Sequence, residues 1–105
     1  MWNHPTEDEL DAIPTLFSTE HVPLGDKQIM MHFYIDFCHW YVTEYDGNDT
    51  FFGLVMLNNR WDQAEWGYFS LREIEKVCIG GVEVTRDLDW SPKPLSDVFP
   101  EGYRL

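Results

Sequence analysis

The chain has 105 residues, of which 44% are hydrophobic and 16% aromatic, so the composition predicts one domain with a compact core and excludes a disordered chain. Its 19 acidic residues against 7 basic ones give a formal net charge of -12. This charge disfavours direct binding to nucleic acid or to anionic membranes, because both need basic patches, and it favours a basic protein as partner.

An acidic helix followed by an irregular segment is predicted at the start of the chain. Thr6 and Glu9 have the spacing of a capping box, in which the Thr6 hydroxyl and the Glu9 carboxylate each accept a hydrogen bond from the other residue's amide. Pro14 cannot continue a helix, so about two turns are expected over residues 7–13. Residues 15–27 are expected to be irregular.

Three consecutive strands are predicted next. Between Gln28 and Ile35 apolar residues alternate with mixed ones, which is typical of a strand with one buried face. Residues 40–57 contain two arms rich in aromatic and β-branched residues on either side of residues 46–49, Asp-Gly-Asn-Asp. Because glycine and asparagine accept the positive φ of tight turns, this stretch predicts a β-hairpin. A fourth strand is predicted for residues 65–69.

The last third of the chain predicts a helix, an edge strand and an extended tail. Ser70 and Glu73 have the spacing of a second capping box, and apolar residues at helical spacing follow over residues 71–77. Gly80 and Gly81 are expected to cap this helix at its C-terminus. Residues 82–88 alternate as a charged strand at a sheet edge, and the prolines after it are expected to keep the tail out of any ladder, with one turn over residues 95–99.

These elements predict a single α+β domain over residues 1–105, an antiparallel β-meander of four or five strands packed against one or two short helices. Its expected parts are an acidic N-terminal helix and loop (1–27), the sheet with the helix 71–77 (28–88) and the extended tail (89–105). Seven apolar side chains are expected in the core: Phe33, Tyr41, Phe52, Leu54, Phe69, Leu71 and Ile74.

The order of five short motifs resembles a known family. They are Trp40-Tyr41-Val42-Thr43-Glu44, Phe51-Phe52-Gly53, Gly67-Tyr68-Phe69-Ser70-Leu71 with Glu73-Ile74-Glu75, Arg86-Asp87-Leu88, and Pro92-Lys93-Pro94-Leu95-Ser96. Over roughly Leu16 to Val98 this order is similar to the pattern WYVTE, FFG, GYFSLxELE, RDL and PKPLS of a family of short proteins of unknown function, carried largely by phages, plasmids and integrative elements. The resemblance implies a shared fold and a mobile-element setting, and it provides no catalytic residues. The acidic N-terminal segment and residues 61–66 depart from the family pattern.

No metal site, cofactor or catalytic group is expected. Cys38, His39, Cys78 and His32 lack the close spacing of zinc ligands, and adjacent residues of a strand point to opposite faces. Acid pairs such as Asp87 and Asp89 are expected by chance in so acidic a chain. Two cysteines are too few for the disulfide framework of a secreted domain, and no basic, apolar leader is present, which predicts a cytoplasmic protein.

Acidic side chains interleaved with aromatic ones are the remaining functional signal, because tryptophan and tyrosine anchor interfaces and carboxylates bind arginine. The residues expected to bind a partner are Glu44, Asp46, Asp49, Trp61, Asp62, Glu65 and Trp66. The alternative is an acidic, soluble protein whose tryptophans fill a small core.

The leading hypothesis is a non-enzymatic inhibitor from a mobile element. It would block a host nucleic-acid-binding defence complex, such as a CRISPR effector, by mimicking nucleic acid or covering its site. Its partner would be a basic host protein or nucleoprotein complex. The competing hypothesis is a sponge for a small molecule or nucleotide, held in an aromatic pocket on the sheet. An enzyme ranks third, because no arrangement of residues indicates a reaction.

Overall fold

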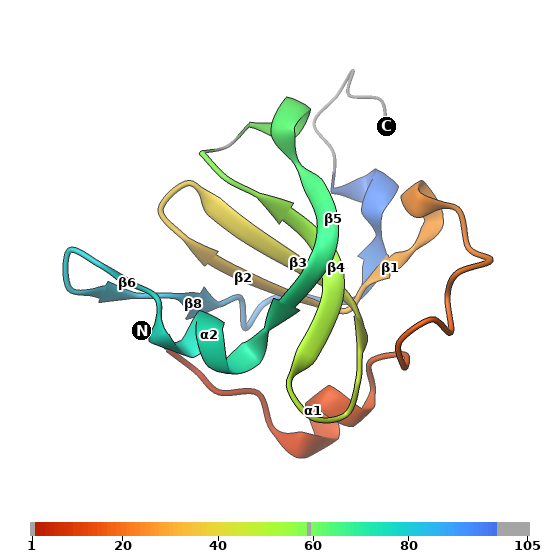
Figure 1. Cartoon of the computed structure of the whole chain (residues 1–105), viewed down its shortest axis with the longest axis horizontal. Coiled ribbons are helices and arrows are strands. Elements are labelled where there is room, and N and C mark those ends of the chain that lie inside the picture. Colours follow the sequence, from red (N-terminus) through yellow and green to blue (C-terminus); the bar gives the residue numbers. More distant parts are fainter. Residues whose placement is uncertain (1, 59, 99–105) are drawn as a thin grey trace.

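A five-stranded antiparallel sheet forms the centre of the computed structural model, which describes residues 2–58 and 60–98 (Figure 1). The strands lie side by side in the order β5, β4, β3, β2, β8. Their bounds are β2 Met31–Ile35, β3 Cys38–Tyr45, β4 Thr50–Met56, β5 Glu65–Ser70 and β8 Thr85–Arg86. The predicted α+β fold with an antiparallel sheet is therefore confirmed. Strands β2 to β5 form the meander, and of the strand predicted at residues 82–88 only Thr85–Arg86 joins the sheet, at its edge beside β2.

Two short helices lie near the turn of the β3–β4 hairpin. Helix α1 (Glu7–Asp11) begins with the predicted capping box at Thr6 and Glu9. Helix α2 (Leu71–Lys76) follows β5 directly, and the Ser70 hydroxyl accepts a hydrogen bond from the Glu73 amide. Ser70 is also the last residue of β5, where it pairs with Thr50. No helix within the described residues is long and apolar enough to cross a membrane.

The strand predicted from Gln28 to Ile35 is broken at Met30. The first part, β1 (Gln28–Ile29), pairs with β9 (Lys93–Pro94), whereas β2 pairs with β3. Between them the Met30 amide donates to the Val42 carbonyl at 2.8 Å. Because of this break, the side chains of Ile29 and Met31 pack into two different hydrophobic cores. The alternation therefore predicted correctly that both residues are buried, but it wrongly predicted that they share one face of a single strand.

Gly80 and Gly81 do not cap α2, which corrects the expectation from the sequence. The helix ends at Lys76, and the two glycines have φ of 59° and 83° in the turn between β6 (Cys78–Ile79) and β7 (Val82–Glu83). Two consecutive residues with positive φ make the favoured two-residue turn of a hairpin, and glycine adopts that conformation without steric cost. A small exposed hairpin therefore separates α2 from β8.

The segment after residue 89 is not an extended tail up to Val98, again contrary to expectation. Pro94 lies opposite Gln28 at the end of the short β1–β9 ladder, where a residue without an amide hydrogen is tolerated. The Leu95 amide donates to the Lys27 carbonyl at 2.9 Å, and the Leu95 side chain is fully buried. The predicted turn is present as the 3-10 helix η3 (Leu95–Asp97), and residues 99–105 lie outside the described part of the chain.

Two hydrophobic cores cover the two faces of the sheet, because successive strand residues such as Tyr41 and Val42 point to opposite sides. The larger core joins the sheet to both helices through Leu10, Ile13, Met31, Phe33, Ile35, Val42, Tyr45, Phe51, Leu71, Ile74 and Val84. The smaller one consists of Ile29, Tyr41, Leu54 and Leu95, with Trp61, Ala64, Trp66, Trp90 and Val98 packed against it. Of the predicted core residues, Phe52 and Phe69 are only half-buried.

Candidate partner-binding surface

The turn of the β3–β4 hairpin is held by two of the predicted partner-binding residues. The Asp46 carboxylate accepts hydrogen bonds from the amides of Asn48, Asp49 and Thr50 at 2.8, 2.9 and 3.0 Å. Burial alone would raise the pKa of Asp46, but these three hydrogen bonds outweigh it and lower the pKa below its ordinary value of 3.8. Asp46 is thus an exposed residue whose carboxylate organises the turn.

Asp49 connects the same turn to helix α2. Its carboxylate accepts from the Arg72 amide at 2.8 Å and from the Ser70 hydroxyl, and its carbonyl accepts from the Leu71 amide. These donors lie in the first turn of α2 and at the residue before it, where backbone amides have no partner within the helix. Asp49 therefore caps the N-terminus of α2, although it belongs to the hairpin turn and not to the segment that leads into the helix.

Glu44 is buried, which corrects its assignment to a binding surface. Only 3% of it is exposed, and its carboxylate accepts from the Phe17 amide at 2.8 Å, the Thr19 amide at 3.0 Å and the Thr19 hydroxyl. A β-bulge between Val42 and Glu44 shifts the register of β3, so the sequence pattern could not place this side chain. Glu44 holds the loop after Pro14 against the sheet.

The remaining predicted residues lie at the other end of the hairpin. Asp62 belongs to the 3-10 helix η2 (Trp61–Gln63). Glu65 is the first residue of β5, and it pairs with Val55 near the end of β4. The 7 residues of β4 span roughly 20 Å, so Asp62 and Glu65 do not meet the hairpin turn, contrary to expectation (Figure 1). Asp62 is paired instead with Arg60 at 3.0 Å.

Both tryptophans of the predicted set pack against the smaller core. Trp61 stacks on Tyr41 with ring centroids 5.9 Å apart, and Trp66 stacks on Phe52 at 5.5 Å. Each is half-buried, so part of each ring remains exposed. The core-filling alternative describes these two residues better than an interface of exposed aromatic anchors does.

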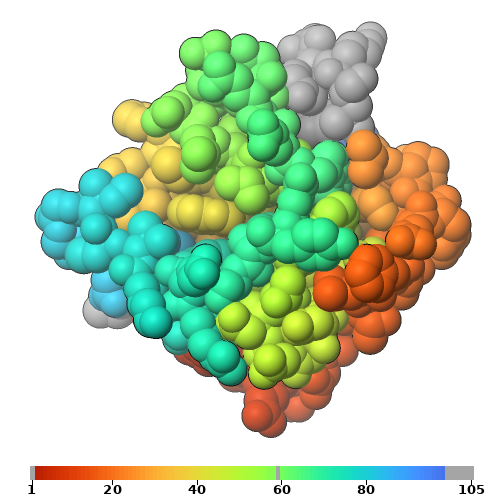
Figure 2. All heavy atoms as spheres, viewed as in Figure 1, coloured from red at the N-terminus to blue at the C-terminus, as the bar shows by residue number. Residues whose placement is uncertain are grey.

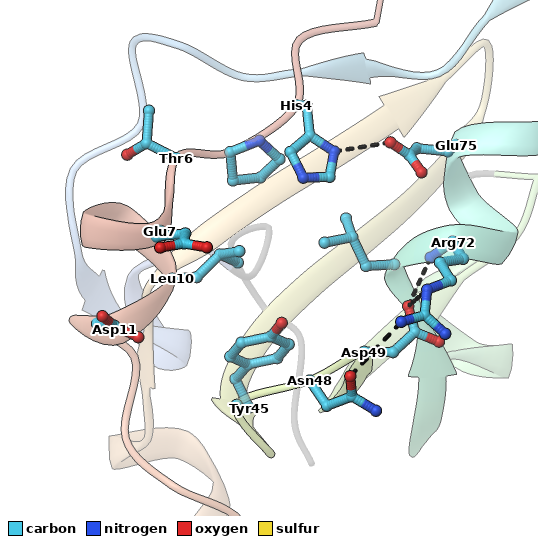
Figure 3. A pocket seen from close by; sticks show the side chains of 13 residues that line it. His4, Thr6, Glu7, Leu10, Asp11, Tyr45, Asn48, Asp49, Arg72 and Glu75 are labelled. Atoms are coloured by element: carbon cyan, nitrogen blue, oxygen red, sulfur yellow. Dashed lines mark hydrogen bonds and ion pairs between the residues drawn. The ribbon is translucent and has the colours of Figure 1, made fainter.

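An acid-lined groove lies where α1, the hairpin turn and α2 meet, and sequence reasoning missed it. Figure 2 shows the yellow-green hairpin turn lying between teal α2 and the red N-terminal residues, and Figure 3 shows the groove among them. Its volume is about 910 Å³. Its charged lining residues are Glu7, Asp11, Asp49, Glu75 and Arg72, with His4 at one wall. Four carboxylates and one guanidinium thus line the groove.

The groove is built by contacts that join distant parts of the chain. The Trp2 indole donates to Glu75 at 3.2 Å, and the His4 ring lies 2.7 Å from the same carboxylate, which fixes the N-terminal segment on α2. Arg86 of β8 forms a two-point ion pair with Glu9, which fixes α1 on the sheet edge. The Arg86 guanidinium and the capping hydrogen bonds lower the pKa of Glu9 to about 2. Glu7 and Asp11, one helical turn apart, consequently share the side of α1 that borders the groove.

A second polar cluster missed by sequence reasoning lies on the opposite face of the sheet. His32 is 7% exposed, and its Nδ1 lies 3.0 Å from an Asp87 oxygen while its Nε2 lies 2.9 Å from Nδ1 of His39. Because a carboxylate only accepts, Nδ1 of His32 carries the proton, and neutral His32 accepts from His39 at Nε2. The ring also stacks on Tyr41, with centroids 4.7 Å apart. No group of three or more His, Cys, Asp or Glu side chains among residues 2–58 and 60–98 could hold a metal ion.

This cluster predicts a pH-dependent stability. Burial lowers the pKa of His32 below its ordinary 6.5, more than Asp87 raises it, while His39 and Lys93 lower it further. Below pH 6.5 the unfolded chain therefore binds more protons at this site than the folded chain does, so the free energy of unfolding falls as pH decreases from 7 toward 5.5. The slope from this one site does not exceed about 1.4 kcal/mol per pH unit.

The measurement is urea denaturation at a series of pH values, with His32→Gln as the comparison. This variant keeps a hydrogen-bonding side chain but cannot titrate, so its free energy of unfolding should change less over that range than that of the unaltered protein. Equal pH slopes for the two proteins would show that His32 titrates alike in the folded and unfolded states.

No curated protein and no solved structure matches this chain. A family of unknown function was expected from the motifs between Leu16 and Val98. One family model, described as protein of unknown function (DUF2958), matches residues 16–100, which is most of the chain. The chain therefore belongs to the DUF2958 family of proteins of unknown function.

Proposed function

We propose that this chain is a non-enzymatic protein of phages or other mobile elements that inhibits a host nucleic-acid-binding defence complex, such as a CRISPR effector, by occupying its basic nucleic-acid site. The observation that carries the proposal is the groove at the hairpin turn, which is lined by four carboxylates and one guanidinium. A net charge of -12 adds a long-range attraction to any basic surface. The motif resemblance described above supports the mobile-element setting.

The groove is suited to this role because its acids come from rigid elements. Glu7 and Asp11 lie on a capped helix that is ion-paired to the sheet, and Asp49 is fixed between the hairpin and α2. Acidic side chains on rigid backbone elements can take the places of phosphate oxygens against arginine and lysine with little rearrangement of the backbone. The hairpin turn predicted as part of the surface is retained, and the distant residues of η2 and β5 are not needed.

Affinity capture from a bacterial lysate, followed by mass spectrometry, identifies the partner. We expect the captured protein to bind this chain and its own DNA or RNA in competition. We also expect the association rate to fall steeply as the salt concentration rises, because at ~0.15 M ionic strength screening already limits the range of interactions between exposed charges to about 8 Å. The proposal would be contradicted if the captured partner bound this chain and its nucleic acid at the same time and if the association rate did not change with salt concentration.

Helix α1 provides a matched pair of variants for that complex. Glu7 lines the groove whereas its neighbour Asp8 does not, and both are exposed acids in the first turn of α1. Glu7→Lys and Asp8→Lys change the net charge and the helix end alike. We expect Glu7→Lys to slow association with the captured partner several-fold more than Asp8→Lys. Equal effects would mean that only the overall charge matters.

A second candidate function, a receptor for a small molecule, is favoured by an aromatic hollow on the other side of the hairpin. Phe17, Phe52 and Tyr68 line a space of about 330 Å³ beside the buried residues Lys27 and Glu44. Phe17 and Tyr68 are largely exposed, and Phe17 has a φ of 68°, which is unusual for a bulky residue. A ligand held there by ring contacts would bind with little dependence on salt.

A further inference from the structure

Tyr45 lies at the floor of the groove with its hydroxyl group unused. The residue is 6% exposed, its ring packs on Phe51 with centroids 5.0 Å apart, and its amide donates to the Pro14 carbonyl at 2.9 Å. The side chain lines the groove, and Figure 3 shows the hydroxyl pointing into it. Within the described part of the chain this hydroxyl makes no hydrogen bond, and its oxygen is not among the fully buried polar atoms, so the groove leaves it open to an incoming donor.

The surroundings of this hydroxyl define what it can bind. Burial raises the pKa of Tyr45, and the charges of Asp46, Asp49 and Asp11 raise it further, against a smaller opposite effect of Arg72. The group therefore stays a neutral phenol at physiological pH, in a negative field. A phenol oxygen accepts a hydrogen bond, and a negative field favours a cationic donor.

The cation that fits is an arginine side chain rather than a metal ion. The structure groups no three acidic, histidine or cysteine side chains of residues 2–58 and 60–98 closely enough for a metal. A planar guanidinium has five donors in a fixed fork, so it can meet acids on two walls and an acceptor at the floor, whereas an ammonium is a single point charge. A space of about 910 Å³ also admits the neighbouring residues of a peptide.

We propose that the groove binds an arginine of a basic protein segment, with its guanidinium donating to the Tyr45 hydroxyl between the two acids of α1 and Glu75 of α2. This inference rests on the proposed function, because it names the group of the partner that the acidic surface takes. On the α1 wall, the side chains of Glu7 and Asp11 make no hydrogen bond or ion pair with any other described residue, so their carboxylates are available. On the far side, Glu75 accepts from Trp2 and His4 through one oxygen only, Oε1.

Isothermal titration calorimetry, with NMR titration to locate the binding site, tests the proposal with three synthetic peptides. The peptides alternate glycine with arginine, with lysine, or with citrulline, which has the shape of arginine but no charge. We expect the arginine peptide to bind more tightly than the lysine peptide and the citrulline peptide not to bind, with amide chemical-shift changes confined to residues around the groove. Equal binding of the arginine and lysine peptides, or shifts spread over the acidic surface, would overturn the proposal.

The decisive variant is Tyr45→Phe, which removes one oxygen and leaves the ring and the net charge unchanged. Because the hydroxyl has no partner in the free protein, the melting temperature should not fall. The Kd of the arginine peptide should rise about tenfold, the effect of losing one hydrogen bond to a charged group, and the preference over lysine should shrink. Asp62→Asn, which removes an acid far from the groove, should change that Kd less than twofold. An unchanged Kd in Tyr45→Phe would overturn the role of the hydroxyl.

These results are independent of the host partner. If the arginine peptide binds in the groove but no nucleic-acid-binding protein is captured from the lysate, the proposed function fails and the arginine site stands. If a captured partner competes with its nucleic acid but Tyr45→Phe binds it as tightly as the unaltered protein does, the function stands and the arginine site fails.

Discussion

Gly53→Ala is expected to lower the free energy of unfolding by about 3 kcal/mol or more, a large part of the 5–15 kcal/mol typical of a domain. A Cβ atom at Gly53 would lie 1.9 Å from the Tyr41 carbonyl oxygen and 2.9 Å from its carbon. Both are backbone atoms of β3, so no side-chain rotation relieves the overlap and the two central strands must separate. The melting temperature should drop by about 12 °C or more.

The close approach has a local cause in the register of β3. Gly53 pairs with Val42, and the bulge at Thr43 follows immediately. A bulge increases the twist of its strand, and glycine is the residue that allows another backbone to come this near. The Phe51-Phe52-Gly53 motif is therefore explained by packing at the bulge and requires no binding role for its glycine.

Gly67→Ala is the matched control, because Gly67 pairs with Gly53 on the adjacent strand β5. A Cβ atom there would meet nothing within 4 Å, so alanine should be tolerated or slightly stabilising. Urea denaturation followed by circular dichroism measures both variants. Equal midpoints for Gly53→Ala and Gly67→Ala would contradict the close approach of β3 and β4.

The local elements of this fold could be predicted because their signals are local. The hairpin turn at residues 46–49, the capping box of α1 and the alternation of β2 each depend on residues a few positions apart. The assignment failed where two signals looked alike. Gly80 and Gly81 follow a helix, as a cap does, but they also have the sequence of a hairpin turn, and only pairing of β6 with β7 decides between them.

The candidate site was less predictable, because it depends on which segments meet. The acids at the hairpin turn were predicted to lie close to each other, and they do. Nothing in the sequence indicated that Glu7 and Glu75 lie across the groove from them, or that Asp62 lies at the far end of the hairpin. Asp46 and Asp49 have local or near-neighbour structural roles that a charge pattern cannot distinguish from binding. The spacing of Glu7 and Asp11 on one helix side was the available signal.

Glu44→Ala is expected to destabilise the fold by about 3–5 kcal/mol, although a charge pattern treats Glu44 as one acid among 19. Its carboxylate accepts from the amides of Phe17 and Thr19 and from the Thr19 hydroxyl, and alanine would leave all three donors without an acceptor. The effect extends to Lys27, which is 5% exposed and donates from Nζ to the Thr19 hydroxyl at 2.9 Å. Thr19 thus links Glu44 to this buried ammonium, and removing Glu44 loosens the position of the hydroxyl that Lys27 contacts.

The loop after Pro14 should respond first, because the three lost hydrogen bonds are its attachment to the sheet. Amide hydrogen exchange measured by NMR is expected to accelerate at Phe17 and Thr19 in Glu44→Ala, and urea denaturation gives the change in the free energy of unfolding. Glu65→Ala is the control, since it removes an exposed acid from the same sheet and should change stability by no more than about 0.5 kcal/mol. If Glu44→Ala unfolds at the same urea concentration as Glu65→Ala and protection at Phe17 persists, the loop is held by other contacts. Glu44 would then again be a candidate for the partner-binding surface.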